Sequence, residues 1–125
     1  MSLLALRAYL ELIRCDICLA CGNFQALHNK VGAFPIRQGL PPSADAAEKI
    51  CEAVDVACIW YWKEVLCLQR SAVTACLLRH HGLPAELVIG ARQMPFMAHA
   101  WVEIGGLVVN DKPYMHEMYA VLDRC

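Results

Sequence analysis

The sequence predicts an α+β fold, with helices in the first part of the chain and a last helix packed on an antiparallel sheet. Residues 3–20 and 67–82 carry apolar side chains at helical spacing. Residues 98–104 alternate between apolar and polar positions, and residues 107–111 complete a hairpin around a Gly-Gly pair. Helices followed by strands are typical of the α+β class.

The sequence indicates an apolar and a charged side for the first helix and the two ends of the second helix. The apolar side of the helix at 3–20 is formed by Leu6, Leu10, Ile13 and Ile17. Another, charged side is formed by Arg7, Glu11 and Arg14. Asn23 is a suitable N-cap for a second helix, which we expect to end at Gly32.

A loop divides the chain into two parts. The stretch "GAFPIRQGLPPS" contains three prolines and two glycines, and Ser43 at its end is the expected N-cap of a third helix. We therefore predict a single domain made of an N-terminal helical region and loop (1–42) and a core (43–125). The buried side of the third helix is expected to carry Ala47, Ile50, Cys51, Val54 and Cys58. No secondary structure is assigned to "IWYWKEVL".

The second half of the chain has the sharpest pattern. "CLQRSAVTACLLRHHG" predicts a largely buried helix that begins at Cys67 and stops at Gly82, with Pro84 just beyond. "ELVIGAR" is a continuous apolar run, which predicts a central strand.

The hairpin around the two glycines has an expected register. We predict a three-residue loop, Ile104-Gly105-Gly106, with a G1 bulge at its last glycine. In that register His99 lies directly opposite Asp111, on the same face of the sheet.

Composition excludes some classes of partner. The formal net charge of −1 provides no basic face for nucleic acid. No apolar run reaches the length of a membrane span, and the N-terminus lacks the pattern of a secretory signal. We therefore expect a cytoplasmic protein whose eight cysteines are reduced. A hydrophobic content of 58% predicts that some apolar surface is reserved for a partner protein.

Cys67 is the cysteine best placed for chemistry. It stands where a long helix begins, so unpaired backbone N–H groups and the helix dipole favour its thiolate. A thiolate attacks carbonyl carbon, and the same N–H groups can stabilise the resulting oxyanion. A small buried thiol is the alternative interpretation, as for the other cysteines.

Geometry narrows the choice of a general base among the five histidines. His80 and His81 lie at the far end of the Cys67 helix, about 20 Å away at ~1.5 Å per residue. His28 and His116 are interpreted as surface residues. His99 lies in a strand expected beside the helix, either as a satisfied core residue or as a base. Asp111 would then fix the tautomer and orientation of its imidazole ring.

The stretch "CLQRSAVTACLLRHHGLPAELVIGARQMPFMAHAWVEIGGLVVND" resembles the core of the lasso peptide biosynthesis B2 proteins. These are transglutaminase-like cysteine peptidases with a papain-type fold. The shared elements are "CLxRS", "LLRxHGLPAELVIG", "PF", "AHAWVE" and "VVND", in order and at matching spacing. The resemblance implies that Cys67 is the nucleophile, His99 the base and Asp111 the orienting acid.

The same resemblance implies a substrate and partners. B2 proteins cut the leader from a ribosomally made precursor after a leader-binding B1 protein has bound that leader. The expected partners are therefore the precursor leader, a separate B1 protein and the lasso cyclase, and no cofactor is expected.

Three alternatives remain open. Cys15, Cys18 and Cys21 have a spacing found in iron–sulfur proteins, although the usual close fourth ligand is missing. A transglutaminase-like acyltransferase shares the acyl-enzyme with a peptidase. A non-catalytic, partner-binding member of the maturation complex is the third.

Three further residues near Cys67 have ambiguous roles. We expect Arg70 to contact either the leader or a buried carboxylate. For Trp60 and Trp62 core packing is favoured over lining an oxyanion site.

Overall fold

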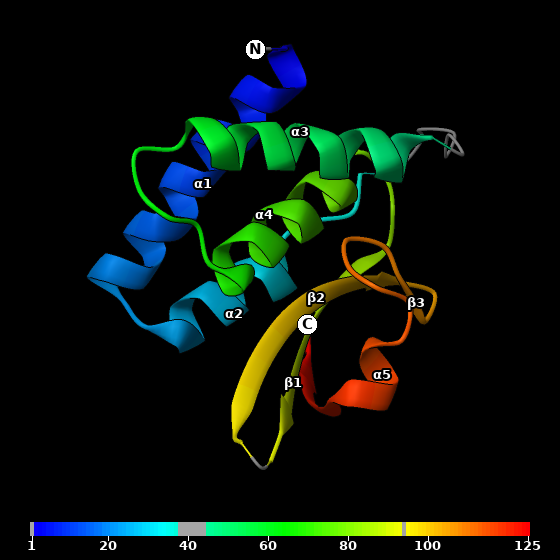
Figure 1. Ribbon diagram of the computed structural model, residues 1–125. Coiled ribbons are helices and arrows are strands. Elements are labelled where there is room, and N and C mark those ends of the chain that lie inside the picture. The colour runs from blue at the N-terminus through cyan, green and yellow to red at the C-terminus, as the bar shows by residue number, and fades with distance from the viewer. Residues whose placement is uncertain (1, 38–44, 94) are drawn as a thin grey trace.

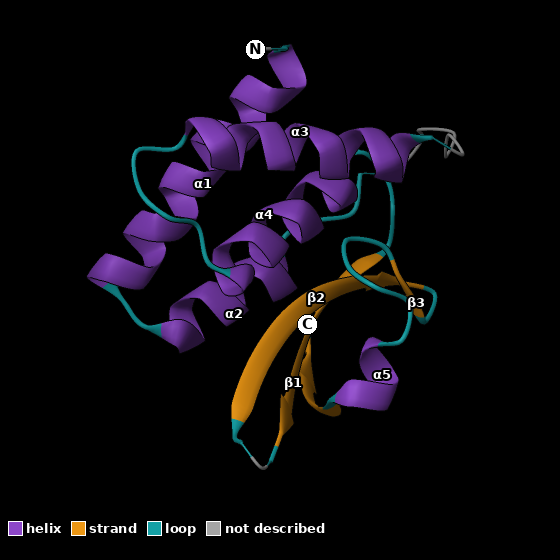
Figure 2. Ribbon diagram, viewed as in Figure 1, coloured by secondary structure: helices purple, strands orange, loops and turns teal. Residues whose placement is uncertain are grey.

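The computed structural model describes residues 2–37, 45–93 and 95–125, and it confirms the α+β class. In Figures 1 and 2 the longer helices lie on one side of a curved sheet, and the short helix near the C-terminus lies on the other. The helices are α1 (Leu3–Cys21), α2 (Phe24–Ala33), α3 (Ala46–Trp60), α4 (Cys67–His80) and α5 (Met115–Met118). The strands are β1 (Ala85–Arg92), β2 (Met97–Ile104), β3 (Leu107–Val108) and β4 (Ala120–Arg124).

The α4 helix lies at the centre of the molecule. It contacts β1 and β2 on one side and α1 and α3 on the other (Figure 1). Its apolar residues are spread around the helix, and nine consecutive residues from Ser71 to Arg79 are buried. A helix without a polar face is stable only when it is surrounded in this way.

The sheet has the strand order β3-β2-β1-β4, with antiparallel neighbours throughout, so β1 is central as predicted. Its two faces bury different clusters. Ala100 and Val102 face the helices, whereas Trp101 packs with Met115 and Tyr119 on the α5 side.

The C-terminal elements α5 and β4 were not predicted. All five side chains of β4 are exposed, so the strand lacks the alternation that would have revealed it. Backbone pairing with β1 holds it in place, through a bulge between Ile89 and Gly90. Strand β4 is therefore stabilised by its backbone pairing with β1 and not by burial of one face of side chains.

Helix ends follow the sequence signals only in part. The Asn23 side chain caps α2 as predicted, accepting a hydrogen bond from the Ala26 N–H at 3.0 Å. Gly32 does not end that helix, which continues to Ala33. Gly82 does end α4: its φ of 88° is positive, as the glycine after a helix often requires. The expected N-cap Ser43 lies outside the described residues, and α3 begins at Ala46.

The α1 helix turns a different side to the core from the one predicted. Leu6, Leu10 and Ile17 are exposed. The buried side is formed by Ala5, Ala8, Glu11, Leu12 and Cys15. Small residues on this side allow close approach to α3 and α4, and the buried Glu11 carboxylate forms an ion pair with Lys30.

The predicted three-residue loop in the hairpin is wrong. Ile104 pairs with Leu107, and Glu103 pairs with Val108, so the loop contains only Gly105 and Gly106. Both glycines have positive φ, 58° and 82°. Two such residues permit a two-residue type I′ turn, whose twist matches that of the strands.

No helix in the described ranges is both long enough and apolar enough to cross a membrane.

Candidate active site

Cys67 is the first residue of α4, as the sequence predicted. The preceding residue, Leu66, accepts a hydrogen bond from the Arg70 N–H at 3.1 Å but has no side-chain oxygen to cap the helix. The N–H groups of the first turn therefore have no acceptor within the helix. They and the helix dipole create a positive potential around the half-buried Cys67 thiol.

His99 and Asp111 form a close pair. The Nε2 atom of His99 lies 2.5 Å from Oδ2 of Asp111, and each side chain is 25% exposed. The other oxygen of Asp111 accepts a hydrogen bond from the Lys112 N–H at 2.8 Å. Because Nε2 is engaged by the carboxylate, Nδ1 is the ring nitrogen available to another partner.

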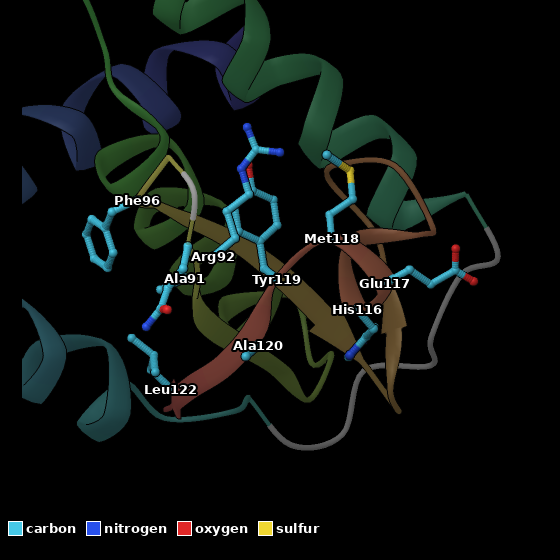
Figure 3. A pocket seen from close by; sticks show the side chains of 10 residues that line it. Ala91, Arg92, Phe96, His116, Glu117, Met118, Tyr119, Ala120 and Leu122 are labelled. Carbon is cyan, nitrogen blue, oxygen red and sulfur yellow. The ribbon is translucent and has the colours of Figure 1, made fainter.

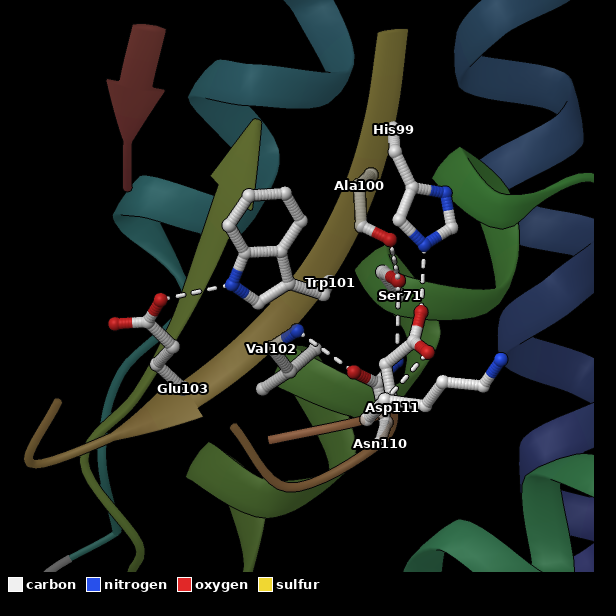
Figure 4. A network of polar contacts seen from close by, with 9 residues as sticks. Ser71, His99, Ala100, Trp101, Val102, Glu103, Asn110 and Asp111 are labelled. Carbon is white, nitrogen blue, oxygen red and sulfur yellow. Dashed lines mark hydrogen bonds and ion pairs between the residues drawn. The ribbon is translucent and has the colours of Figure 1, made fainter. Parts of the chain in front are cut away.

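Asn110 explains how Asp111 reaches His99 (Figure 4). The β3 ladder ends at Val108, and the Asn110 side chain then takes the place of a backbone acceptor: its Oδ1 accepts from the Val102 N–H at 2.7 Å. Its Nδ2 donates to Ser71 Oγ at 3.1 Å. This replacement turns the chain out of the regular ladder and leaves Asp111 free to face the imidazole ring.

Ser71 ties the same segment to the helix that carries Cys67. Its hydroxyl is buried and donates to the Ala100 carbonyl at 3.0 Å while accepting from Asn110. These bonds join α4, β2 and the segment after β3 (Figure 4). Neither Ser71 nor Asn110 was among the predicted site residues, although both stand in the shared motifs "CLxRS" and "VVND".

Aromatic rings support His99 from the α5 side of the sheet. Its ring centroid is 5.4 Å from that of Tyr119 and 6.1 Å from that of Trp101. Gly90 is the β1 residue paired with His99. A Cβ atom at Gly90 would lie 2.6 Å from the Trp101 ring and 2.9 Å from Tyr119 Cβ. The absence of a side chain there permits this packing.

One small cavity brings the three predicted residues together. Its volume is about 180 Å³. It is lined by Val65, Cys67, Arg70, Ser71, His99, Ala100, Asn110 and Asp111. A thiol at a helix N-terminus therefore shares a cavity with a histidine–carboxylate pair, a set suited to nucleophilic attack on a carbonyl group.

The other histidines take part in different contacts. His28 contacts Asp123 and His116 contacts Glu103, so neither is the simple surface residue that we expected. His81 bonds to the Leu77 carbonyl. Of the described histidines, only His99 lines the cavity with Cys67.

Several other thiols lie in surroundings that oppose ionisation. All eight cysteines are free. Burial raises the pKa of Cys15 and of Cys76 to about 12, and that of Cys51 to about 11. Burial also raises the pKa of Cys58 and Cys125.

The three N-terminal cysteines do not converge. Cys15 is buried, Cys18 is half-buried and Cys21 is exposed, all on α1. Within the described part of the chain, no group of three or more histidine, cysteine or acidic residues has the geometry to hold a metal ion.

The residues of ambiguous role near Cys67 lie at the surface. Arg70 lines the cavity and contacts the exposed carboxylate of Asp55 at 2.8 Å, rather than a buried one. Trp60 and Trp62 are 66% and 74% exposed, so the expectation that they pack in the core is wrong. The aromatic ring of this segment that is buried belongs to Tyr61.

A wider pocket adjoins the site through Tyr119 (Figure 3). Its volume is about 590 Å³. Apolar walls come from Phe96, Met118 and Leu122, and the guanidinium of Arg92 lies over the Tyr119 ring at 5.8 Å. Figure 3 shows the Arg92 and Glu117 side chains extending in different directions. The pocket therefore combines apolar surface with charged groups, the guanidinium of Arg92 and the carboxylate of Glu117.

Glu103 forms a second polar centre, on the α5 side of β2. It is fully buried, and its carboxylate accepts bonds from Trp101 Nε1 at 2.8 Å and Arg124 at 2.7 Å. His116 Nε2 lies 2.8 Å from the same group. Burial by itself would raise the pKa of Glu103, but the bonds from Arg124 and Trp101 and the nearby charges lower it overall. This residue links β2 to β4 and α5.

Comparison with known proteins agrees with these features. Residues 10–124 match the model of the Transglutaminase-like superfamily. The microcin J25-processing protein McjB of Escherichia coli is 43% identical over 56 residues, which make up 45% of this chain. The chain spans 27% of the length of that curated relative. No solved structure gives a significant match. The first two findings confirm the resemblance inferred from the sequence.

Proposed function

Since the chain belongs to the transglutaminase-like superfamily, we propose that it is a cysteine peptidase that removes the leader from a lasso peptide precursor. The observation that carries the proposal is the single cavity that holds the Cys67 thiol beside the His99–Asp111 pair. Similarity to a protein named for processing microcin J25 supports a peptide precursor as the substrate. This is the activity of a lasso peptide biosynthesis B2 protein.

In the proposed reaction, the Cys67 thiolate attacks the carbonyl carbon of the scissile bond. The N–H groups of the first turn of α4 stabilise the negative charge that develops on the carbonyl oxygen. His99 gives its proton to the leaving amine, and the C–N bond breaks to leave a thioester on Cys67. Water, deprotonated by His99, then attacks the thioester, releases the leader as a carboxylic acid and restores the thiol.

Asp111 and Asn110 act on this reaction through His99. The carboxylate of Asp111 orients the ring and stabilises the imidazolium while the proton is held. Asn110 fixes the segment that carries Asp111, through bonds to Val102 and Ser71. Asp111 is thus the proposed orienting acid, and Asn110 is a positioning residue.

The wider pocket beside Tyr119 is the proposed site for one side chain of the substrate, because it adjoins His99 and has apolar walls. The proposed partners are a separate leader-binding B1 protein, which presents the precursor, and the lasso cyclase, which uses the product. The proposed location is the cytoplasm.

The test is cleavage of a lasso precursor peptide by the purified chain in the presence of its B1 protein, followed by mass spectrometry. Cys67→Ala should abolish cleavage while circular dichroism shows an unchanged fold. Cys21→Ala is the matched control, because this cysteine is exposed on α1, outside the residues that line the cavity, and the variant should cleave normally. Cleavage by Cys67→Ala at the normal rate would overturn the assignment of the nucleophile.

The alternative activities give different products in the same assay. An acyltransferase would transfer the leader to an added amine, such as methylamine, in preference to water. A non-catalytic member would bind the precursor and B1 without producing either product.

A further inference from the structure

We propose that the outer side of α1 is a docking surface for an amphipathic helix of a partner protein that carries carboxylates beside its apolar residues. The outer side of α1 is defined by Leu3, Leu6, Leu10, Ile13 and Ile17. The proposal is independent of the peptidase reaction, because α1 contributes no residue to the cavity around Cys67.

Helix α1 has two apolar sides, and the fully buried residues of the core come from only one. Ala5, Ala8 and Leu12 pack inward with the buried Cys15. On the outer side, Leu3 is 86% exposed, Leu10 51% and Ile17 55%. Ile13 of the same row is half-buried against the core, whereas the four exposed side chains of the row cost solubility. An exposed contiguous apolar surface of this kind marks an interaction site.

The spacing of the apolar residues on the outer side of α1 indicates that the partner contributes a helix. Its five residues follow one another at intervals of three, four, three and four, which is the a/d pattern of a heptad repeat. Over 14 steps at ~1.5 Å each, the row is about 21 Å long. Side chains at this spacing fit as knobs into the holes of a second α-helix.

Hollows at both ends of the row provide room for such a helix. One, of about 510 Å³, is lined by Leu3, Leu4, Leu6, Arg7, Leu10, His80 and His81. The other, of about 400 Å³, is lined by Ile13, Asp16, Ile17, Ala20, Tyr61, Trp62 and Lys63. The exposed ring of Trp62 stands at this second end, where a large amphipathic side chain is suited to contact a partner.

The charges beside the row are positive. Arg7 and Arg14 occupy the flanking e positions of the repeat, and both are exposed. No carboxylate among the described residues lies within salt-bridge distance of Arg7, and its guanidinium approaches His80 Nδ1 at 3.4 Å. Arg14 contacts Glu11 at 3.5 Å, but Glu11 is buried and already paired with Lys30.

The acidic residue on the other flank is already neutralised. Asp16 accepts a bond from the Tyr61 hydroxyl at 2.5 Å and contacts Lys63 at 3.2 Å. A partner helix with glutamate or aspartate at its flanking positions therefore complements the arginines and meets no free carboxylate here.

Charge and shape disfavour two other occupants. In an antiparallel pair of copies of this chain, the e positions face each other, so Arg7 would lie near Arg14 of the second copy. A membrane surface would require a wide apolar face, whereas this row is as narrow as a coiled-coil seam.

The proposal is tested with the full chain and two synthetic helical peptides of three heptads. Both peptides carry leucine at a and d; one has glutamate at e and g, and the other has lysine there. In fluorescence anisotropy at low salt, the glutamate peptide should bind about tenfold more tightly than the lysine peptide. The double substitution Leu6→Asp/Leu10→Asp should weaken that binding by about tenfold or more.

Two further variants sharpen the test. Arg7→Glu/Arg14→Glu should reverse the preference between the peptides. Leu107→Asp is the matched control, because this leucine is 73% exposed in the hairpin, outside α1, and its variant should bind normally. Circular dichroism checks the fold of every variant.

Three outcomes would overturn the proposal. The first is equal binding of the two peptides, or binding that the leucine and arginine variants do not change. The second is a dimer in sedimentation velocity that Leu6→Asp/Leu10→Asp converts to a monomer, which would identify a second copy as the occupant. The third is co-sedimentation with phosphatidylserine-containing vesicles that the same variant abolishes.

Discussion

His99 Nε2 lies 2.5 Å from Asp111 Oδ2, although the turn that joins their strands would place Lys112 opposite His99. The pairing of Ile104 with Leu107 sets that register. Asp111 reaches the ring because the ladder ends at Val108 and the Asn110 side chain then bonds to β2. The pair therefore results from an interruption of the hairpin.

Asp111→Asn should reduce kcat by about 10²- to 10⁴-fold, because the amide neither stabilises the imidazolium nor selects the same tautomer. The loss should be smaller than that in Cys67→Ala, which lacks the nucleophile. The measurement is the rate of leader release under saturating precursor. Asp123→Asn is a suitable control, since Asp123 lies on β4 and contacts His28. Full activity in the Asp111→Asn variant would show that Asp111 is not needed to orient His99.

Asn110→Ala should lower kcat by at least about tenfold and leave KM nearly unchanged, because it releases the segment that positions Asp111. Two neutral hydrogen bonds are lost, at about 1 kcal/mol each. Asn110→Asp keeps the acceptor for Val102 and should recover part of the activity.

The control for this substitution is Asn29→Ala, which removes an exposed side chain bonded to Gln25. Urea unfolding measures stability alongside kinetics. If Asn110→Ala lowered stability without changing kcat, Asn110 would have only a structural role.

Cys67 should react with iodoacetamide faster than Cys21 under native conditions, although Cys21 is more exposed. We expect this because the Cys67 thiol lies at the N-terminus of α4 and shares its cavity with the His99 imidazole, surroundings that are typical of reactive cysteines. Cys15 and Cys76, whose pKa is raised to about 12 by burial, should be labelled only after unfolding. Peptide mapping after limited alkylation makes the comparison, and His99→Ala should slow the labelling of Cys67.

Glu103→Gln should destabilise the fold at pH 7 by about 2 kcal/mol, since a buried acceptor of charged bonds is replaced by a neutral amide. The loss is limited because Arg124 and His116 are 39% and 40% exposed and regain water. The lowered pKa of Glu103 also sets a pH dependence. Its stabilising contribution is complete above the ordinary value of 4.5 and is lost as pH falls through the folded value.

Urea unfolding at pH 7 and in the acid range tests both effects. Wild-type protein should lose more stability in acid than Glu103→Gln does. Glu117→Gln, at an exposed glutamate on α5, should follow the wild type. Identical acid profiles for Glu103→Gln and the wild type would show that this carboxylate does not contribute to the pH dependence.

Elements that bury a regular apolar pattern could be predicted from the sequence. Helix α4 and its start at Cys67 were predictable because the apolar residues of this stretch have helical spacing and Gly82 ends the helix. The central strand β1 was predictable because both of its faces are covered. The choice of Cys67, His99 and Asp111 also came from the sequence, through chemistry and an ordered set of motifs.

Features that depend on contacts between distant segments could be recognised only in the folded chain. Periodicity could not predict the buried side of α1, because two sides of this helix are apolar. The side that carries the small residues is buried, where it contacts α3 and α4. Strand β4 exists through backbone pairing with β1, which has no side-chain signature. The two-residue turn and the Asn110 bonds set the final position of Asp111. Local patterns encode the burial of one surface, whereas the position of a single side chain depends on which distant donors and acceptors the packed chain brings within reach.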